Sequence, residues 1–402
     1  MTTGRRMAIL GGGPVGLECL LRAVREGWEA TLFERGRVGE NVRGWGHVRM
    51  FSPLEMNLSE AARAVARDTC AWTPGSEELL TGNEYVARHL EPLAGSRELA
   101  GRVRTGTEVL AVSRGGLRKG DEIATPARGR RPFWILVRDD RGERVESAEI
   151  VIDATGTFGS PNWLGPGGIP AIGETLAATA IEYRLPDITG SDRDRFAGRH
   201  TAVIGAGHSA ATAIGWLGEV AAAWAGTTVT WVTRSSDKQP VAEIAGDPLP
   251  ERERVTRLAN DAAGRAPGWL EREVGASVLA VSGDGGRHRL RVANGGNPRE
   301  LVADRVLALV GYRPDLGLAR ELQVQTCWAT EGTYPLAAAL LSQTGGTADC
   351  LTAGANLDAA TLKHPEGGFY TLGMKSYGRN PNFLIRAGLK QIDDLFALLG
   401  SA

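Results

Sequence analysis

Short apolar runs alternate with amphipathic stretches along the chain and predict an α/β protein. Residues 7–10 and 29–33 form mostly apolar runs of strand length, and residues from about 15 to 26 place apolar side chains at helical spacing. The same order returns later as a strand at 201–204, a helix to about residue 224 and a strand at 228–233. Each triplet predicts a strand, a helix and a second, parallel strand.

A glycine-rich turn joins the first strand to the first helix. Gly11, Gly13 and Gly16 form G-x-G-x-x-G, and Glu34 ends the second strand 23 residues after Gly11 (34 minus 11). Such a loop lets the backbone approach a pyrophosphate at the start of a helix, and the acid accepts hydrogen bonds from a ribose. We therefore predict an FAD site. Its expected residues in this part of the chain are Gly11, Gly13, Pro14, Val15, Gly16, Glu34 and Arg35.

A second loop of the same kind follows the strand at 201–204. It reads G-x-G-x-x-A, and the place of the acidic residue is taken by Arg234, followed by two serines. A guanidinium with neighbouring hydroxyls suits a 2′-phosphate, whereas a carboxylate repels one. This pattern favours NADPH. The residues expected at the second site are Gly205, Gly207, His208, Ser209, Ala210, Arg234 and Ser235.

The two loops also predict how the chain is divided. Apolar strands that end near Gly156 and Gly311 indicate crossings between domains, and the polar segment 183–198 lies beside one of them. We predict two Rossmann-like, three-layer α/β domains. The FAD-binding domain comprises residues 1–180 and 315–402, and the NADPH-binding domain, residues 181–314, is inserted into it. Segments 114–131 and 282–298 are rich in glycine and charge, and we expect surface hairpins without function there.

Composition narrows the range of partners. The chain has 402 residues, 42% of them hydrophobic, and 46 basic residues balance 47 acidic ones to a net charge of −1. This balance provides no basic field for nucleic acid and no cationic face for a membrane. No apolar run reaches the roughly 18 residues of a membrane helix, and the first apolar run ends at once in glycines. We expect a cytoplasmic protein that acts on small molecules.

The cysteines exclude one class of mechanism. Cys19, Cys70, Cys327 and Cys350 are far apart, so the sequence contains neither a C-x-x-C pair nor the spacing of a zinc site. We therefore expect no metal site and no dithiol chemistry. Cys19 and Cys350 are predicted to be core residues, although a single reactive thiol at Cys350 stays open.

At this point the chain resembles the flavoproteins with two dinucleotide-binding domains, which include thioredoxin-reductase-like enzymes and class B flavin monooxygenases. The resemblance rests on both glycine loops, Glu34, and the segments 154–156, 310–314 and 368–373. It implies that Val109 meets the adenine and that Thr155, Gly156 and Gly373 lie along the FAD. The aspartate that usually follows the late glycine is absent here. Lys375 is the candidate to replace it, with a solvated surface lysine as the alternative.

The loop after Glu34 is similar to one that passes the flavin ring in such proteins. It carries Trp45, His47, Arg49 and Phe51. Trp45 is therefore expected at the flavin, and His47 and Arg49 are candidates for proton transfer. The alternative is that the aromatic residues belong to the core and the polar ones to an edge strand.

The reaction type is left open by two missing fingerprints. The chain lacks the C-x-x-C of thioredoxin reductases, and residues 169–199 lack the F-x-G-x-x-x-H of class B monooxygenases. The first expectation is an NADPH-dependent FAD monooxygenase that uses molecular oxygen to oxidise an amine, sulfur or ketone centre through a C4a-hydroperoxyflavin. The alternative is an NADPH-dependent reductase of a disulfide, quinone or protein acceptor. A nucleotide-binding protein without activity is a third possibility, which two complete cofactor motifs disfavour.

Overall fold

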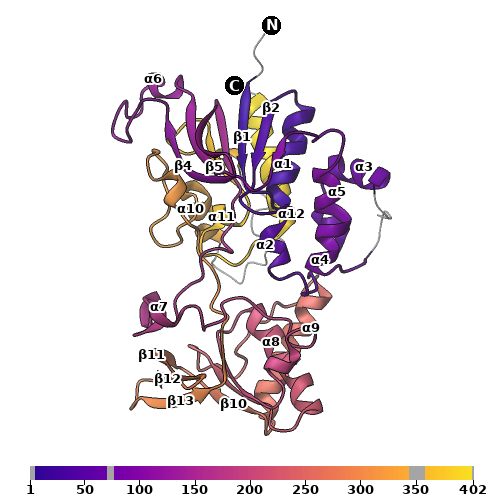
Figure 1. Ribbon diagram of the computed structural model, residues 1–402, viewed down its shortest axis with the longest axis vertical. Coiled ribbons are helices and arrows are strands. Elements are labelled where there is room, and N and C mark those ends of the chain that lie inside the picture. Colours follow the sequence, from indigo (N-terminus) through magenta and orange to yellow (C-terminus); the bar gives the residue numbers. More distant parts are fainter. Residues whose placement is uncertain (1–4, 70–76, 344–357, 401–402) are drawn as a thin grey trace. The chain divides into compact units, whose positions relative to one another are not determined.

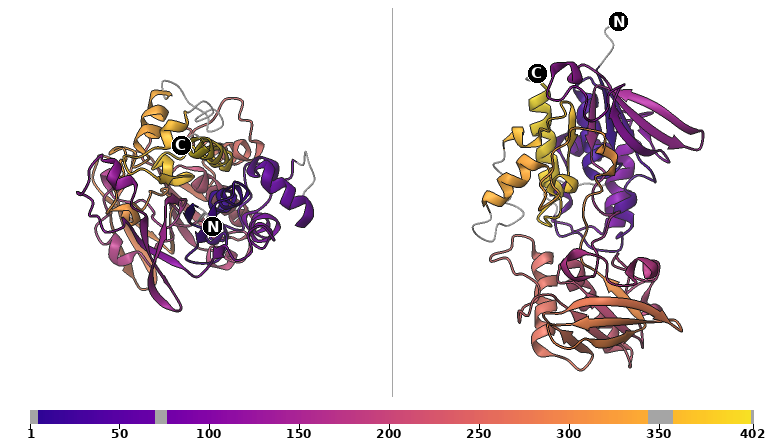
Figure 2. Two further views of the ribbon diagram at one scale, coloured as in Figure 1. Left: turned by 90° about the horizontal axis from the view of Figure 1, so that it is seen from above. Right: turned by 90° about the vertical axis from the view of Figure 1, so that its left-hand side faces the viewer.

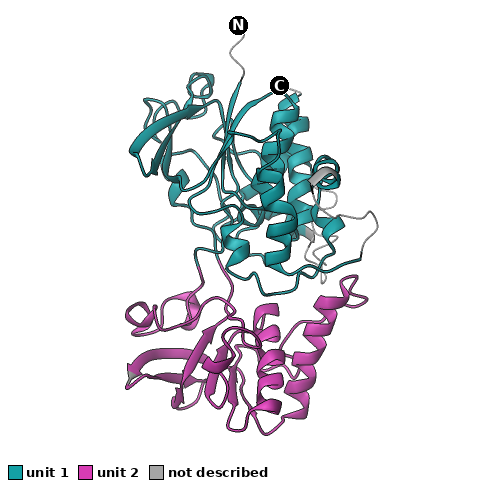
Figure 3. Ribbon diagram, turned by 45° about the vertical axis from the view of Figure 1, so that its right-hand side comes forward, with its two compact units in different colours: residues 1–160, 313–402 teal, residues 161–312 magenta. Residues whose placement is uncertain are grey.

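The computed structural model describes residues 5–69, 77–343 and 358–400, and it divides into two compact units. Unit 1 comprises residues 1–160 and 313–402, and unit 2 comprises residues 161–312 (Figure 3). The first change of unit lies at residue 160, whereas the sequence led us to expect it at 180. The reason is a contact with a later part of the chain, because Ile172 forms a backbone bridge with Ala280. Within the segment, the buried Glu174 carboxylate accepts a 2.7 Å hydrogen bond from the backbone amide of Ala171. Which cofactor each unit binds stays a prediction.

Unit 1 is built on a parallel sheet with the strand order β15–β7–β1–β2–β3, and a second, antiparallel sheet has the order β4–β5–β6. The strands are β1 (Arg6–Leu10), β2 (Glu29–Phe33), β3 (Val103–Arg104), β4 (Glu108–Arg114), β5 (Phe133–Asp139), β6 (Gly142–Ala148), β7 (Ile150–Asp153) and β15 (Phe369–Thr371). The helices are α1 (Pro14–Arg25), α2 (Glu40–Arg43), α3 (Glu60–Thr69), α4 (Gly82–Tyr85), α5 (Glu91–Ala94), α6 (Pro126–Gly129), α10 (Tyr334–Gln343), α11 (Met374–Tyr377) and α12 (Ile385–Gly400).

The parallel sheet of unit 1 is covered on both faces (Figures 1 and 2). Successive side chains of a strand point to opposite faces, and β1 shows this directly. Met7 and Ile9 pack in the core shared with the helices, whereas Ala8 and Leu10 pack in the core shared with the antiparallel sheet. A strand that is buried on both faces reads as a continuous apolar run, which is why the sequence revealed it.

Unit 2 repeats this architecture. Its parallel sheet has the order β10–β9–β8–β14, and its antiparallel sheet has the order β11–β12–β13. The two α/β units confirm the predicted fold class. The elements are β8 (His200–Ile204), β9 (Thr228–Val232), β10 (Leu270–Glu273), β11 (Ser277–Asp284), β12 (Arg287–Ala293), β13 (Arg299–Ala303), β14 (Arg305–Ala308), α7 (Glu174–Ala177), α8 (His208–Ala223) and α9 (Pro250–Arg265).

One expectation about unit 1 holds only in part. Segment 114–131 was predicted to be a surface hairpin without function. It connects the antiparallel strands β4 and β5, and residues 118–126 are exposed, but Arg114 and Arg128 are buried at 1% and 3% exposure. Both guanidinium groups donate to the buried carboxylate of Glu366, at 2.7 and 2.8 Å. The arginines therefore fasten this segment to the chain that leads into β15. The sequence did not reveal the burial of these arginines because charged side chains are usually exposed unless they are paired, and their partner Glu366 is distant in sequence.

Candidate cofactor sites

The first glycine loop lies at the carboxyl end of β1, and its glycines have different structural roles. Gly11 has a φ of +104°, and a Cβ there would lie 2.6 Å from the carbonyl oxygen of Ala154. A Cβ on Gly16 would strike the carbonyl oxygen of Gly11. These two glycines are thus required for packing. Gly13 has an ordinary φ, and a Cβ there would meet nothing within 4 Å. The backbone of Gly13 therefore faces open space, and its contact with a pyrophosphate stays a prediction.

Glu34 lies beside this loop at the end of β2. Its carboxylate accepts hydrogen bonds from the backbone amides of Gly12, at 2.6 Å, and of Gly36, at 2.7 Å. A carboxylate has about four acceptor positions, so capacity remains for ribose hydroxyls. The backbone amide of Thr107 donates to the Glu34 carbonyl at 2.9 Å, which brings the start of β4, with the half-buried Val109, next to this residue.

An ion pair between Lys375 and Asp153 lies at the carboxyl ends of β7 and β15, and the sequence had assigned no role to Asp153. Lys375 is 3% exposed, which overturns the alternative of a solvated surface lysine. Its Nζ donates to Asp153 at 2.6 Å and to the Thr155 hydroxyl at 3.0 Å. Asp153 thus supplies a carboxylate at this edge, although none follows Gly373. The only sequence signal for it was the strand that it ends.

Backbone geometry around these residues is equally specific. Gly156 and Gly373 have φ angles of +70° and +72°, which favour glycine. The Gly373 amide donates to the buried Gln391 side chain at 2.8 Å. Gln391 in turn donates to the Ser376 hydroxyl at 2.8 Å, so α12 fixes the turn that carries Lys375.

The loop with the candidate catalytic residues is only partly a core segment. The Trp45 ring packs against Gly82, where a Cβ would lie 2.9 Å from it, and against the helical core. His47 is half-buried. Arg49 is exposed, forms an isolated backbone bridge with Thr81, and donates to a backbone carbonyl at 2.8 Å. A flavin contact of Trp45 and proton transfer by His47 or Arg49 stay predictions.

The second loop, at the carboxyl end of β8, has the same construction. Gly205 has a φ of +126°, and a Cβ there would strike the carbonyl oxygen of Leu309. Gly207 again faces open space, with nothing within 4 Å of a Cβ. Ala210, in the place of the third glycine, is fully buried, whereas Ser209 is exposed. Each loop therefore has one glycine that packs against the backbone of a neighbouring segment and one glycine that faces open space.

His208 begins α8 directly after the open glycine. Burial lowers the pKa of His208, and the nearby Arg252 cation lowers it further, so the imidazole is neutral at pH 7. A cavity of about 90 Å³ adjoins this side chain and is lined also by Asp247 and Arg257. Asp247 and Arg252 form a buried ion pair at 2.7 Å. Contact of His208 with a nucleotide stays a prediction.

The two residues expected at a 2′-phosphate differ in availability. Arg234 is exposed and has no hydrogen bond or ion pair within residues 5–69, 77–343 and 358–400. Ser235 is half-buried, and its hydroxyl donates to the Asp237 carboxylate. The Arg234 guanidinium therefore has no acidic partner among the described residues, whereas Ser235 has one. Contact of either residue with a 2′-phosphate stays a prediction.

The cysteines that the structure describes differ sharply. Cys19 is fully buried in α1, as expected, and burial raises the pKa of its thiol to about 12. Cys327 is half-exposed, and a hydrogen bond with the Thr330 side chain lowers its pKa. Cys70 and Cys350 lie outside the described residues. Among the described helices, none has the length and apolar character needed to cross a membrane.

Comparisons with known proteins place this chain among nucleotide-dependent oxidoreductases. The model of the pyridine nucleotide-disulphide oxidoreductase family matches residues 5–332. No protein with a curated description matches the sequence. Similar solved structures include a bacillithiol disulfide reductase from Bacillus cereus, with a TM-score of 0.70, 19% identity and 99% of both chains covered.

Two further similar structures come from the monooxygenase and thioredoxin reductase groups. The ornithine N-hydroxylase of Kutzneria sp. 744 has a TM-score of 0.62 at 15% identity and covers 99% of both chains. The thioredoxin reductase of T. acidophilum has a TM-score of 0.58 at 17% identity, with 98% of this chain and 99% of that chain covered. At such identities the likeness concerns the fold alone.

Proposed function

Because the chain belongs to the pyridine nucleotide-disulphide oxidoreductase family, we propose that it is an NADPH-dependent flavoprotein whose electron acceptor reacts directly with the flavin. The family agrees with the resemblance inferred from the motifs, and FAD with NADPH is its cofactor pair. The observation that carries the proposal is the pair of glycine loops, one in each unit. Each has a glycine, Gly13 or Gly207, at which a Cβ would meet nothing within 4 Å.

In this proposal unit 1 binds FAD and unit 2 binds NADPH. The Gly13 backbone faces the FAD pyrophosphate, and Glu34 accepts hydrogen bonds from the adenosine ribose. In unit 2 the Gly207 backbone faces the second pyrophosphate, and Arg234 meets the 2′-phosphate as an unpaired cation. The bound cofactors supply hydride transfer from the nicotinamide to the flavin, and the protein contributes binding, orientation and charge.

Two features of the cysteines support direct transfer from the flavin to the acceptor. The sequence has no C-x-x-C pair that could relay electrons from the flavin. Cys19 is a poor nucleophile because the thiolate is the reactive form and its pKa is about 12. The acceptor that we propose first is molecular oxygen, with a small amine, sulfur or ketone compound receiving one oxygen atom. The shared fold of the ornithine N-hydroxylase supports this choice.

A second acceptor, a small disulfide, is favoured by Cys327. This thiol is half-exposed and its pKa is lowered, so it is the more reactive of the two described cysteines. The bacillithiol disulfide reductase from Bacillus cereus shares the fold over the whole chain. In this alternative the Cys327 thiolate would attack the disulfide and release one thiol. The two electrons that NADPH passes to the flavin would then reduce the resulting mixed disulfide to the second thiol and free Cys327.

One experiment separates these acceptors. The FAD-loaded protein is reduced with one equivalent of NADPH under anaerobic conditions and then mixed either with ¹⁸O₂ and a panel of amines, thioethers and ketones, or with cystine without oxygen. A monooxygenase incorporates ¹⁸O into an organic product and releases less peroxide than the oxygen it consumes. A disulfide reductase reoxidises its flavin with cystine alone and, when excess NADPH is supplied, turns over at its full rate without oxygen.

A matched variant tests the role of the thiol. Cys327→Ser should slow disulfide turnover at least tenfold and leave oxygen uptake unchanged, whereas Cys19→Ser should leave the rates of both reactions in the folded protein unchanged. Failure of NADPH to reduce the bound flavin in the absence of oxygen would refute the proposed function for both acceptors.

A further inference from the structure

Lys375 is unusual for a lysine in this protein. The sequence contains five lysines and 41 arginines (46 minus 5), so most of its basic side chains are arginines. Lys375 is 3% exposed, and it is the buried lysine of the described residues. Lysine carries a compact point charge, whereas arginine carries a planar, delocalised one. The chain therefore uses its compact cation at a buried position.

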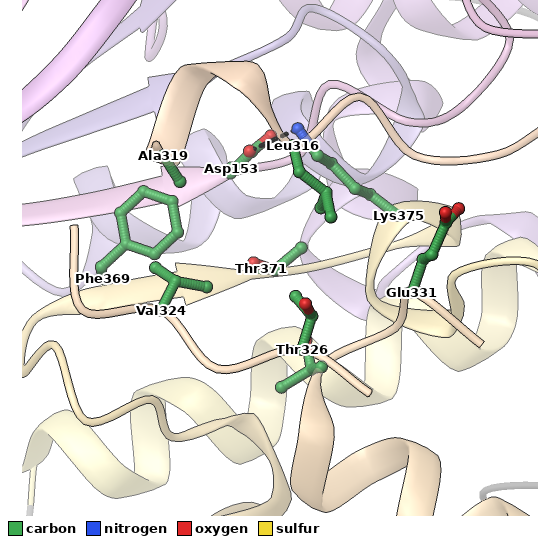
Figure 4. A pocket seen from close by; sticks show the side chains of 10 residues that line it. Asp153, Leu316, Ala319, Val324, Thr326, Glu331, Phe369, Thr371 and Lys375 are labelled. Carbon is green, nitrogen blue, oxygen red and sulfur yellow. Dashed lines mark hydrogen bonds and ion pairs between the residues drawn. The ribbon is translucent and has the colours of Figure 1, made fainter. Parts of the chain in front are cut away.

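Two acceptors fix the position of this charge. Nζ of Lys375 lies 2.6 Å from Oδ2 of Asp153 and 3.0 Å from the Thr155 hydroxyl. The Thr155 hydroxyl donates to Oδ1 of the same carboxylate at 2.7 Å, which closes a ring of hydrogen bonds. Figure 4 shows the Lys375 side chain reaching Asp153 at the end of its strand. The charge is thus held by β7 and by the turn after β15.

The surroundings strengthen the field of this pair. A cavity of about 20 Å³ borders Lys375 and Asp153 (Figure 4). Its wall includes the apolar side chains of Leu316, Val324 and Phe369, and it also includes Glu331, whose carboxylate pairs with Arg379 at 2.8 Å. Charges interact more strongly where water is excluded. A buried ion pair is also often no more stable than well-packed apolar residues of the same volume. Stability alone is therefore a weak reason for the pair.

The pair also lies where a cofactor belongs. Strands β15, β7 and β1 are parallel neighbours, so their carboxyl ends share one edge of the sheet. Asp153 is the last residue of β7, Lys375 follows β15, and the open Gly13 loop follows β1. Ligands of such sheets bind at this edge.

We propose that Lys375 sets the electron affinity of the flavin and that Asp153 is the positioning residue that holds this cation and partly neutralises it. The inference rests on the proposed binding of FAD in unit 1. Hydride transfer adds negative charge to the flavin, so a nearby cation favours the reduced cofactor. The neighbouring carboxylate opposes this effect, and the balance of the two charges sets the potential.

The reduction potential of the bound flavin tests the proposal without measuring turnover. Anaerobic spectroscopic titration against a dye of known potential gives its value. Asp153→Asn should favour the reduced flavin at least tenfold, a positive shift of about 30 mV for a two-electron couple. Lys375→Gln should shift the potential in the opposite direction. The double variant should lie between the two single variants, because both charges are removed.

Further variants separate a charge effect from a folding defect. Lys375→Arg keeps the positive charge, so the potential should stay near that of the wild type. Arg128→Met breaks a different buried ion pair of unit 1. It should lower the melting temperature without changing the reduction potential. If the Lys375→Gln variant does not fold, the reduction potential of the Asp153→Asn variant alone tests the inference. An Asp153→Asn protein that binds FAD with an unchanged potential overturns the inference and leaves the proposed function intact. Absence of FAD from the wild-type protein would instead defeat the proposed function.

Discussion

At the scale of single residues, Arg234 and Glu34 differ in what already surrounds them. The guanidinium of Arg234 is exposed and without a polar partner in the described part of the chain, whereas the Glu34 carboxylate is held by two backbone amides. Arg234 should therefore increase the affinity only for a ligand that carries a negatively charged group. The Glu34 carboxylate should accept hydrogen bonds from the ribose hydroxyls of any nucleotide bound at this loop.

Replacing Arg234 should change the choice of pyridine nucleotide. Arg234→Ala removes a charge-assisted contact worth about 1.5 to 3 kcal/mol, so the Michaelis constant for NADPH should rise tenfold or more and that for NADH should barely change. Steady-state kinetics with both nucleotides measures this. Arg265→Ala, an exposed arginine on α9, is the control and should alter neither constant. An equal loss for both nucleotides would assign Arg234 a structural role.

Replacing Glu34 should weaken the binding of FAD but not of FMN. Glu34→Gln removes the negative charge that the ribose hydroxyls would contact, at a cost of about 1.5 to 3 kcal/mol, and FMN lacks the adenosine ribose. Fluorescence titration of the apoprotein with each flavin measures the two affinities. Mass spectrometry of the cofactor released from the purified protein should find FAD, and finding FMN would contradict the assignment.

At the scale of elements, the first glycine loop offers a matched pair of substitutions. In Gly13→Ala the added methyl group enters open space, so the melting temperature of the apoprotein should hold while FAD affinity falls at least tenfold. In Gly16→Ala the methyl group strikes the carbonyl oxygen of Gly11, so the apoprotein itself should lose stability. Thermal unfolding and flavin titration of both variants test this. A Gly13→Ala protein with normal FAD affinity would place the pyrophosphate elsewhere.

The ion pairs that fasten segment 114–131 should make stability depend on pH. Burial alone would raise the pKa of Glu366, but hydrogen bonds from Arg128 and Arg114 outweigh it, so the pKa lies below its usual value. A carboxyl group with a lowered pKa contributes stability above its unfolded pKa of about 4.3, and this contribution is lost as the pH falls through the folded value.

Glu366→Gln should therefore cost about 3 to 5 kcal/mol of unfolding free energy at pH 7, and the difference from the wild type should narrow below about pH 4.3. Urea unfolding at both pH values measures it. Glu98→Gln is the control, because Glu98 pairs with Arg25 at the surface and should cost at most about 1 kcal/mol. A constant difference across this pH range would contradict the role of the ionised carboxylate.

At the scale of the whole molecule, the two loops belong to different compact units and should act independently in binding. Gly207→Ala should lower the affinity for NADP⁺ at least tenfold and leave the FAD content unchanged, while Gly13→Ala should do the reverse. Calorimetric titration with NADP⁺ and the absorbance of bound flavin provide the two measurements. Loss of both cofactors from either variant would show that the sites are coupled.

The sequence by itself determined the features whose cause is local. A tight turn at Gly11, a close helix contact at Gly16 and a strand buried on both faces each leave a pattern within a few residues, so the glycine loops and the class of fold were predictable. The family match agrees with this prediction. Glu34 was found for the same reason, since its spacing from the loop is set by one strand–helix–strand unit.

The tertiary structure decided the contacts between distant parts of the chain. Asp153 and Lys375 are 222 residues apart, and Arg114 and Glu366 are 252 apart. Asp153 and Lys375 meet because β15 pairs with β7 in the parallel sheet, an order that no local pattern specifies. Arg114 ends a strand of the separate antiparallel sheet and reaches Glu366, which lies just before β15. For the same reason the expected boundary at 180 differs from the change of unit at 160: the pairing of residues 161–180 with β11 depends on a strand that lies about a hundred residues later. Local periodicity predicts elements, whereas strand order brings charged groups together, and burial then makes the pairing of those charges necessary.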